Sequence, residues 1–178
     1  MKTLIITYKD NLEFAEETAV VLKNDWNIES EIIIGHKIGG QYTRTNVIMH
    51  NWCDFIEGGE DTTMVLDDDV RFVKDPMDID FNIDVNWIGF RRGRLENKRP
   101  FITGSQAVVF KPRVLKDIIR DFSSKKKKIQ IDYGISRFLV KNKNKYSIFQ
   151  PKLSYAYEAD HQSLISLDNW KKYTKPPV

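Results

Sequence analysis

The sequence predicts an α/β fold in which a Rossmann-like, mostly parallel sheet is flanked by helices. In the first half of the chain, short β-branched runs alternate with segments of helical periodicity, which is typical of parallel strands joined by crossover helices. The 178 residues, 41% apolar and 12% aromatic, can bury a core, which excludes disorder for most of the chain. This length suits one domain over 1–167 with a tail over 168–178.

The first half predicts two strand–helix units and a third strand. A buried strand over 3–8 is followed by apolar residues at helical spacing over 12–22. A second strand over 30–34 and a second helix over 45–56 each end at glycines. The third apolar strand, 62–66, runs directly into three aspartates.

The second half is less regular. Strands are predicted over 85–90 and 101–110, and Pro112 opens a helix that extends to about Phe122. Asp132 can cap a further helix over 133–140. Two short strands follow, at 147–149 and 153–155.

Charge is divided unevenly along the chain. Residues 1–90 carry 7 basic and 18 acidic side chains, a net charge of −11. Residues 91–178 carry 21 basic and 7 acidic side chains, a net charge of +14, so the overall charge of +3 conceals two opposite halves. This asymmetry indicates that the partners of the two halves differ in charge.

The short apolar runs exclude a transmembrane span, and the single cysteine excludes an intramolecular disulfide. The longest early apolar run, 4–6, is far shorter than the about 20 residues that cross a bilayer, and no signal-peptide cleavage site follows it. We therefore expect a cytoplasmic protein. The single cysteine, Cys53, lies at helical spacing between Met49 and Ile56, which favours a buried small hydrophobe over a nucleophile.

The most informative feature is the run Asp67-Asp68-Asp69 directly after an apolar strand. Open α/β sheets bind their ligands at the carboxyl ends of the strands. Adjacent carboxylates repel one another unless they face water or a cation, and Mg²⁺ and Mn²⁺ take oxygen ligands and bridge to phosphates. The run therefore predicts a divalent cation site, with a solvated acidic turn as the alternative.

The surrounding motifs resemble the GT-A-fold glycosyltransferases, especially the family-2-like members. Arg44-Thr-Asn46 opens the helix before the acidic strand, Gly58-Gly59-Glu60 follows that helix, and Asp67-x-Asp69 ends the strand. Met64-Val-Leu66 before the aspartates, and Val70 to Pro76 after them, continue the likeness. In order and spacing the resemblance runs from Thr3 to about Leu164.

This resemblance implies a nucleotide and metal site in the first half. Asp67 would contact the ribose or base, with Asp68 in the same nucleotide site, and Asp69 would hold Mn²⁺ or Mg²⁺ on the diphosphate. Arg44 and Asn46 would border the nucleotide pocket. An ordinary solvated arginine is the alternative for Arg44.

The downstream motifs imply the acceptor side and the base. Gly104 and Ser105 lie in a segment similar to the family's acceptor-side strand, where a glycine lets substrate approach the backbone. Asp132 matches the aspartate that serves as catalytic base in inverting members, although the usually acidic position before it is Ile131. A plain helix N-cap is the alternative for Asp132.

Near the end of the chain, Asp160-His161-Gln-Ser163 is similar to the family's His-x-x-Ser ending. The resemblance implies that His161 is a third protein ligand of the metal, and imidazole suits Mn²⁺ better than Mg²⁺.

Together these motifs imply a metal-dependent glycosyltransferase. It would move a sugar from a nucleoside-diphosphate sugar, with a UDP-sugar favoured, to an acceptor hydroxyl with inversion. Residues 1–90 would form the donor half and 91–167 the acceptor half.

The basic second half predicts an anionic acceptor or partner. DNA carrying a hydroxylated base, as in small phage-encoded DNA glycosyltransferases, is one such acceptor, and an acidic glycan or a lipid phosphate is another. Solvated lysines that keep the protein soluble are the alternative. The candidate anion-binding residues are Arg91, Arg92, Arg94, Lys125, Lys126, Lys127 and Lys128.

Two other function classes remain open. A nucleotidyltransferase would use the same aspartates for a cation, but it needs a glycine-rich phosphate loop or a second acidic pair, and neither is evident. A non-catalytic DNA- or glycan-binding module would carry the aspartates as a degenerate turn.

Overall fold

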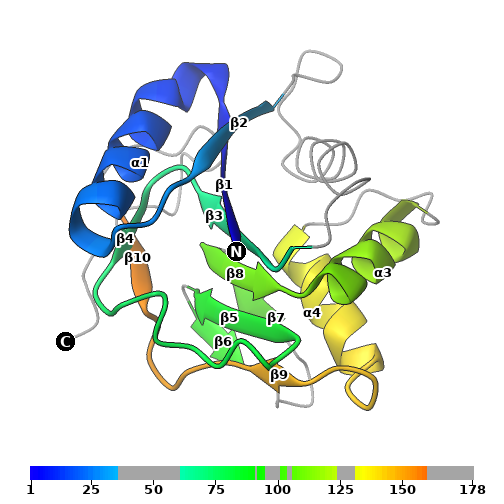
Figure 1. Ribbon diagram of the computed structural model, residues 1–178. Helices are drawn as coiled ribbons and strands as arrows, with labels where there is room; N and C mark the ends of the chain where they lie inside the picture. The colour runs from blue at the N-terminus through cyan, green and yellow to red at the C-terminus, as the bar shows by residue number, and fades with distance from the viewer. Residues whose placement is uncertain (36–60, 91, 95–100, 104–105, 124–130, 160–178) are drawn as a thin grey trace.

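The computed structural model describes residues 1–35, 61–90, 92–94, 101–103, 106–123 and 131–159 (Figure 1). In chain order the elements are β1 (Lys2–Tyr8), η1 (Lys9–Asn11), α1 (Leu12–Trp26), β2 (Glu31–Gly35), β3 (Thr63–Asp67), β4 (Val70–Phe72), β5 (Val85–Gly89), β6 (Arg92–Arg94), β7 (Phe101–Thr103), β8 (Ala107–Phe110), α3 (Pro112–Ser123), α4 (Ile131–Lys141), β9 (Ile148–Phe149) and β10 (Ala156–Glu158).

The main sheet of the described residues has six strands in the order β2-β1-β3-β8-β5-β9. β1 pairs in parallel with both β2 and β3, and β5 pairs in parallel with β9. Only β8 runs antiparallel to its neighbours in this sheet, β3 and β5. The predicted mostly parallel α/β fold is therefore confirmed. Two smaller pairs, β4 with β10 and β6 with β7, are antiparallel.

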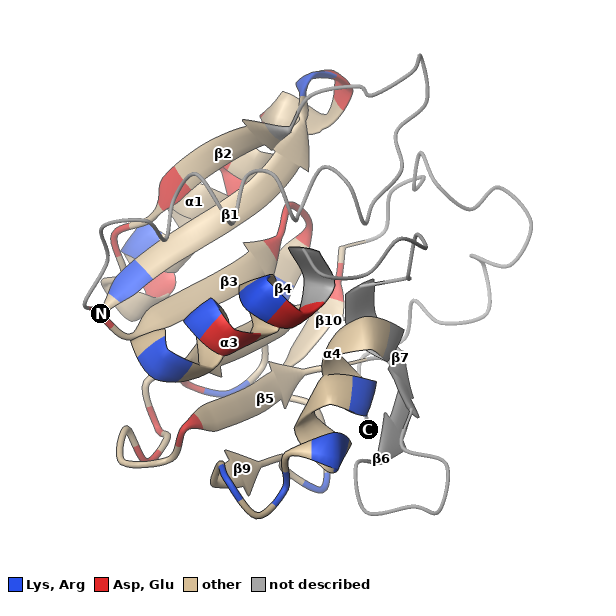
Figure 2. Cartoon of the chain, turned by 90° about the vertical axis from the view of Figure 1, so that its right-hand side faces the viewer, with Lys and Arg blue, Asp and Glu red and all other residues tan. Residues whose placement is uncertain are grey.

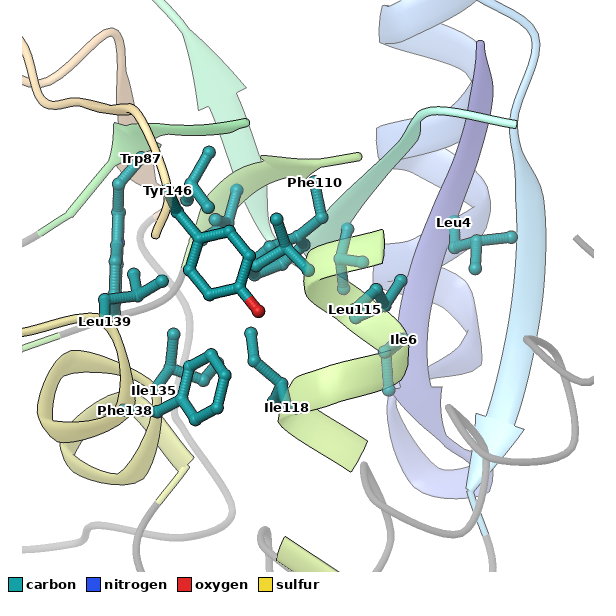
Figure 3. Close-up of a cluster of buried hydrophobic side chains, with 14 of the residues drawn as sticks. Leu4, Ile6, Trp87, Phe110, Leu115, Ile118, Ile135, Phe138, Leu139 and Tyr146 are labelled. Carbon is teal, nitrogen blue, oxygen red and sulfur yellow. The ribbon is translucent and has the colours of Figure 1, made fainter. Parts of the chain in front are cut away.

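Alternating residues of the central strands bury their side chains on opposite faces of the sheet. On one face, Val65 of β3 and Trp87 of β5 pack with Val114 and Ile118 of α3 and with Leu139 of α4. Figure 3 shows Trp87, Phe110 and the side chains of both helices meeting in this cluster.

The opposite face packs against α1 and the β4–β10 pair. Ile5 of β1 and Leu66 of β3 cluster there with Leu22 of α1 and Ala156 of β10. Figure 1 shows α1 on one side of the sheet and α3 and α4 on the other. The helices thus cover both faces, and the ends of the strands provide the edge at which a ligand can bind.

β5 and β8 approach each other closely where β5 ends. The register shifts between Trp87 and Gly89, and Gly89 lies opposite Ala107. A Cβ at Gly89 would lie 2.6 Å from the backbone nitrogen of Ala107 and 2.7 Å from its Cβ. Only glycine permits this approach without a shift of the backbone.

The predicted helices in the described residues are present, with different ends. α1 continues four residues beyond Leu22 and stops where Asn27 adopts a left-handed conformation, φ 54°. The amide of Ile28 then donates to the carbonyl of Leu22 at 3.0 Å, which closes the end of the helix. α4 begins at Ile131 rather than at Tyr133.

Two strand predictions were wrong in their limits. The single strand expected over 101–110 is split into β7 and β8, which belong to different sheets. The strand expected over 153–155 lies three residues later, at 156–158. The chain is bent rather than extended at the expected position, where the Ser154 hydroxyl accepts the amide hydrogens of Phe90 and Ala156.

Other predictions fall outside the described residues, namely the helix over 45–56, the environment of Cys53 and the tail over 168–178. Within the described residues, no helix has the length and apolar content needed to span a membrane.

Candidate functional site

The three aspartates lie at the carboxyl edge of the main sheet, as the sequence predicts. Asp67 is the last residue of β3, and Asp68 and Asp69 form the two-residue turn that leads into β4. The parallel strands β1 and β2 also end at this edge, at Tyr8 and Gly35. The sheet therefore presents its acidic turn where α/β proteins bind ligands.

Asp67 is fixed between two neighbouring strands. It lies opposite Ile6 of β1, and its amide donates to the carbonyl of Gln106 at 3.1 Å. Because side chains alternate along β3, Asp67 falls on the sheet face of Val65, which α3 and α4 cover. Gln106 is buried, and its Oε1 accepts no hydrogen bond from any described residue. A polar acceptor thus lies beside Asp67 at the sheet edge.

Asp68 is directed toward the first strand–helix unit. Its Oδ2 accepts hydrogen bonds from Thr7 Oγ1 at 2.8 Å and from Asn11 Nδ2 at 3.1 Å. Its backbone carbonyl accepts a third from Thr18 Oγ1 at 2.7 Å. The middle aspartate is thus held by β1, η1 and α1.

Asp69 is buried, with 8% of its surface exposed. Its backbone carbonyl accepts the amide hydrogen of Ala159 at 2.7 Å, next to the β4–β10 pair. The C-terminal part of the chain therefore returns to the acidic turn. His161 follows two residues later in the sequence and lies outside the described residues.

Asp132 lies in the first turn of α4. α4 packs on the same sheet face as Asp67, through Ile135 and Leu139, and it also packs against β7. The fold therefore brings the helix of Asp132 and the Asp67 position to one face of the sheet.

The donor set at the acidic turn fits a hard divalent cation. Mg²⁺ and Mn²⁺ accept carboxylate oxygens, and Mg²⁺ is usually held by one or two carboxylates together with water and substrate phosphates. Asp67 and Asp69 offer such oxygens. Within the described ranges, no group of three or more His, Cys, Asp and Glu side chains is arranged as a metal site.

Of the remaining predicted site residues, two lie within the described ranges. Arg92 and Arg94 lie in β6, which pairs with β7. Those outside the described residues are Arg44, Asn46, Arg91, Gly104, Ser105, Lys125, Lys126, Lys127, Lys128 and His161.

A second buried carboxylate, Asp84, lies at the opposite edge of the sheet. Arg113 forms a bidentate pair with it at 2.8 and 2.6 Å, and Ser147 donates from its amide at 2.9 Å and its hydroxyl at 3.1 Å. The Arg113 guanidinium, together with the Ser147 donors, holds the pKa of Asp84 below its ordinary value of 3.8, against the opposing effect of burial. These contacts tie β5 to α3 and to the start of β9, which is a structural role.

Sequence reasoning missed the residues that hold the acidic turn. Thr7 interrupts an apolar strand, Asn11 ends η1, and Thr18 is a fully buried threonine inside an amphipathic helix. A polar residue at a buried position is the signal that could have identified each of them, because buried polar groups are hydrogen-bonded.

Comparison with known proteins identifies the fold. No family model and no curated protein matches the chain. The catalytic domain of Drosophila beta-1,4-galactosyltransferase 7, in complex with xylobiose, matches 98% of this chain and 78% of its own, with a TM-score of 0.58 and 12% identity. A mutant of the Drosophila enzyme bound to manganese, UDP-Gal and xylobiose matches 99% of this chain and 80% of its own, also with a TM-score of 0.58 and 12% identity.

The chain therefore has the GT-A fold of glycosyltransferases, the fold that its sequence motifs resemble.

Proposed function

We propose that the protein is a metal-dependent glycosyltransferase that moves a sugar, a hexose or pentose, from a nucleoside-diphosphate sugar to an acceptor hydroxyl. The observation that carries the proposal is the Asp67–Asp69 turn, which lies at the carboxyl edge of the sheet in a GT-A fold. One protein with this fold binds manganese and UDP-Gal, which favours a UDP-sugar as donor and Mn²⁺ as metal.

The roles proposed for the aspartates are those that the family resemblance implies. Asp67 contacts the nucleotide, and Asp69 holds the cation on the diphosphate. A bound cation supplies Lewis-acid stabilisation of the charge that develops on the leaving diphosphate. Arg44 and Asn46 border the nucleotide, and His161 completes the ligand set.

Asp132 is the proposed base. Its carboxylate takes the proton of the acceptor hydroxyl as that oxygen attacks the anomeric carbon from the side opposite the leaving group, so the configuration inverts. General-base assistance contributes about 10²- to 10⁴-fold to the rate. Gly104 and Ser105 belong to the acceptor side.

The acceptor half is proposed to take an anionic acceptor. Figure 2 shows Lys and Arg on α4, and on α3 together with Asp117 and Asp121, and the net charge of residues 91–178 is +14. β6, which carries Arg92 and Arg94, pairs with β7, and β7 packs against the helix of Asp132. Steep weakening of binding with salt would support a polyphosphate acceptor such as DNA with a hydroxylated base. Salt-independent binding, or none, would exclude that acceptor and leave the transferase proposal intact.

The test is a thermal-shift measurement with a panel of UDP- and GDP-sugars, with and without Mn²⁺. A donor at 100 times its Kd stabilises the folded state by about 2.7 kcal/mol, so the correct donor should raise Tm only when Mn²⁺ is present. EDTA should abolish the shift, and Asp69→Asn should abolish it too.

Two variants sharpen this test. Asp61→Asn removes the same charge from an exposed residue before β3, at the opposite edge of the sheet, and should keep the full shift. Asp132→Asn should keep the shift and lower kcat by about 10²- to 10⁴-fold. If no nucleotide sugar stabilises the protein at any Mn²⁺ concentration, the proposal is wrong.

A further inference from the structure

We propose that Asp68 is a positioning residue: it anchors the acidic turn to β1 and α1, so that Asp67 and Asp69 are held in place for their ligands. The sequence alone predicts that Asp68 contacts the nucleotide, whereas its hydrogen bonds favour this different role. The inference rests on the proposed function, which supplies the ligand that its two neighbours bind.

The carboxylate of Asp68 is engaged from the interior of the protein. Both donors to its Oδ2, Thr7 Oγ1 at 2.8 Å and Asn11 Nδ2 at 3.1 Å, belong to buried residues, 0% and 7% exposed respectively. Two donors occupy the two lone pairs of a carboxylate oxygen. Both lone pairs of Asp68 Oδ2 are therefore used by donors from β1 and η1.

The backbone of Asp68 is held as well. Thr18 Oγ1 donates to its carbonyl at 2.7 Å and accepts a hydrogen bond from Arg71 Nη1 at 2.6 Å. Arg71 in turn pairs with Glu17 at 2.8 Å and donates to the carbonyl of Val70 at 3.0 Å. Because Thr18 is fully buried and its hydroxyl both donates and accepts, its orientation is fixed, and α1 fixes the turn.

The neighbours of Asp68 are tied to other elements by their backbones. The amide of Asp67 donates to the carbonyl of Gln106, and the carbonyl of Asp69 accepts from the amide of Ala159. The side chain of Asp68 adds a link from this turn to Thr7 of β1 and to Asn11 of η1, beyond the pairing of β3 with β1. Releasing it would let the two neighbouring carboxylates shift, and a site that is loose by about 1 Å binds poorly.

The decisive variant is Thr7→Val, which keeps the shape of the side chain and removes one donor to Asp68. Thr7 is 0% exposed, so it cannot itself touch a ligand. The probe is Mn²⁺ with UDP, measured by the electron paramagnetic resonance signal of free Mn²⁺. Loss of a group that holds metal ligands in place weakens metal affinity by about 10- to 100-fold. We expect the lower end, about tenfold, for the Mn²⁺ Kd of Thr7→Val and Asp68→Ala, because neither change removes a proposed ligand.

Two further variants separate positioning from direct binding. Asp68→Asn keeps an oxygen that can accept from both Thr7 and Asn11, so its Mn²⁺ Kd should stay within about threefold of wild type. The double variant Thr7→Val/Asp68→Ala should bind Mn²⁺ no more weakly than Asp68→Ala, because both changes break the same link.

The matched control is Thr3→Val on the same strand. Thr3 is also buried, but its hydroxyl makes no hydrogen bond with the described residues, so its loss should leave the Mn²⁺ Kd unchanged. An unchanged Kd for Thr7→Val overturns the inference, and so does an Asp68→Asn variant that loses Mn²⁺ as fully as Asp69→Asn. If Asp69→Asn itself binds Mn²⁺ and UDP like the wild type, the proposed function fails instead.

Discussion

The ion pair between Asp84 and Arg113 gives a quantitative test of what holds the second half of the sheet. Asp84 is 3% exposed and accepts four hydrogen bonds of 2.6 to 3.1 Å from Arg113 and Ser147. In Asp84→Asn, one of the two acceptor oxygens becomes an NH₂ donor that must face another donor. A hydrogen bond to a charged group contributes about 1.5–3 kcal/mol.

We therefore expect Asp84→Asn to lower the free energy of unfolding by about 2–3 kcal/mol at pH 7. The full cost of breaking a buried ion pair does not apply, because the Arg113 side chain is 64% exposed and regains water. In a domain of this size, that loss lowers Tm by about 2–4 °C per kcal/mol.

The lowered pKa of Asp84 fixes the direction in which its contribution to stability changes with pH. Arg113 holds the pKa of Asp84 below 3.8, so the carboxylate stabilises the folded state fully above that pH. The stabilisation is lost as pH falls through the lowered pKa. The difference between wild type and Asp84→Asn should therefore be constant from pH 7 to about pH 5 and should shrink below pH 3.8.

Urea unfolding followed by tryptophan fluorescence at pH 7, 5 and 3 measures this difference, since Trp87 is fully buried. Asp78→Asn is the control, because that carboxylate is exposed and pairs with an exposed lysine, Lys74. It should leave the unfolding midpoint close to that of wild type. A stability difference for Asp84→Asn that is the same at pH 3 as at pH 7 would refute the reasoning.

Two further predictions concern packing. Gly89→Ala should lower the free energy of unfolding by about 1–3 kcal/mol, because its Cβ would lie 2.6 Å from the backbone of Ala107; urea unfolding that matches wild type would contradict the close approach of β5 and β8. Ile118→Ala leaves a cavity in the buried cluster between α3 and the sheet, and it should lower the free energy of unfolding by about 2–5 kcal/mol in the same assay. The control is Val20→Ala, at a 57% exposed position of α1, which should have little effect on the free energy of unfolding. If Ile118→Ala and Val20→Ala lowered it equally, the assigned core would be wrong.

Much of the fold could be predicted because the signals are local. β1, β2, β3 and β5 are short, mostly apolar runs, and α1, α3 and α4 carry apolar residues at helical spacing. β4 and β6 are three residues long, and each is defined by a partner elsewhere in the chain. β4 pairs with β10, more than 80 positions later, and no local pattern reveals such a pairing.

The same limit applies to the candidate site. An acidic run at the end of an apolar strand predicts a ligand site, because strand ends of parallel sheets meet at one edge. The residue types alone could not set Asp68 apart from Asp67 and Asp69, because adjacent identical residues carry identical chemistry, and the roles expected of them came from the family resemblance. The side chains that donate to Asp68 are Thr7, Asn11 and Thr18, which are remote in the sequence and come together only in the folded chain.

The sequence by itself thus determined the α/β class, the location of the acidic turn and the opposite charges of the two halves, because composition and periodicity are properties of the chain. Only the tertiary structure decided the antiparallel place of β8, the close approach at Gly89 and the anchoring of Asp68. The physical reason is that each of these depends on hydrogen bonds or contacts between segments far apart in sequence, whose geometry is set by packing rather than by local propensity.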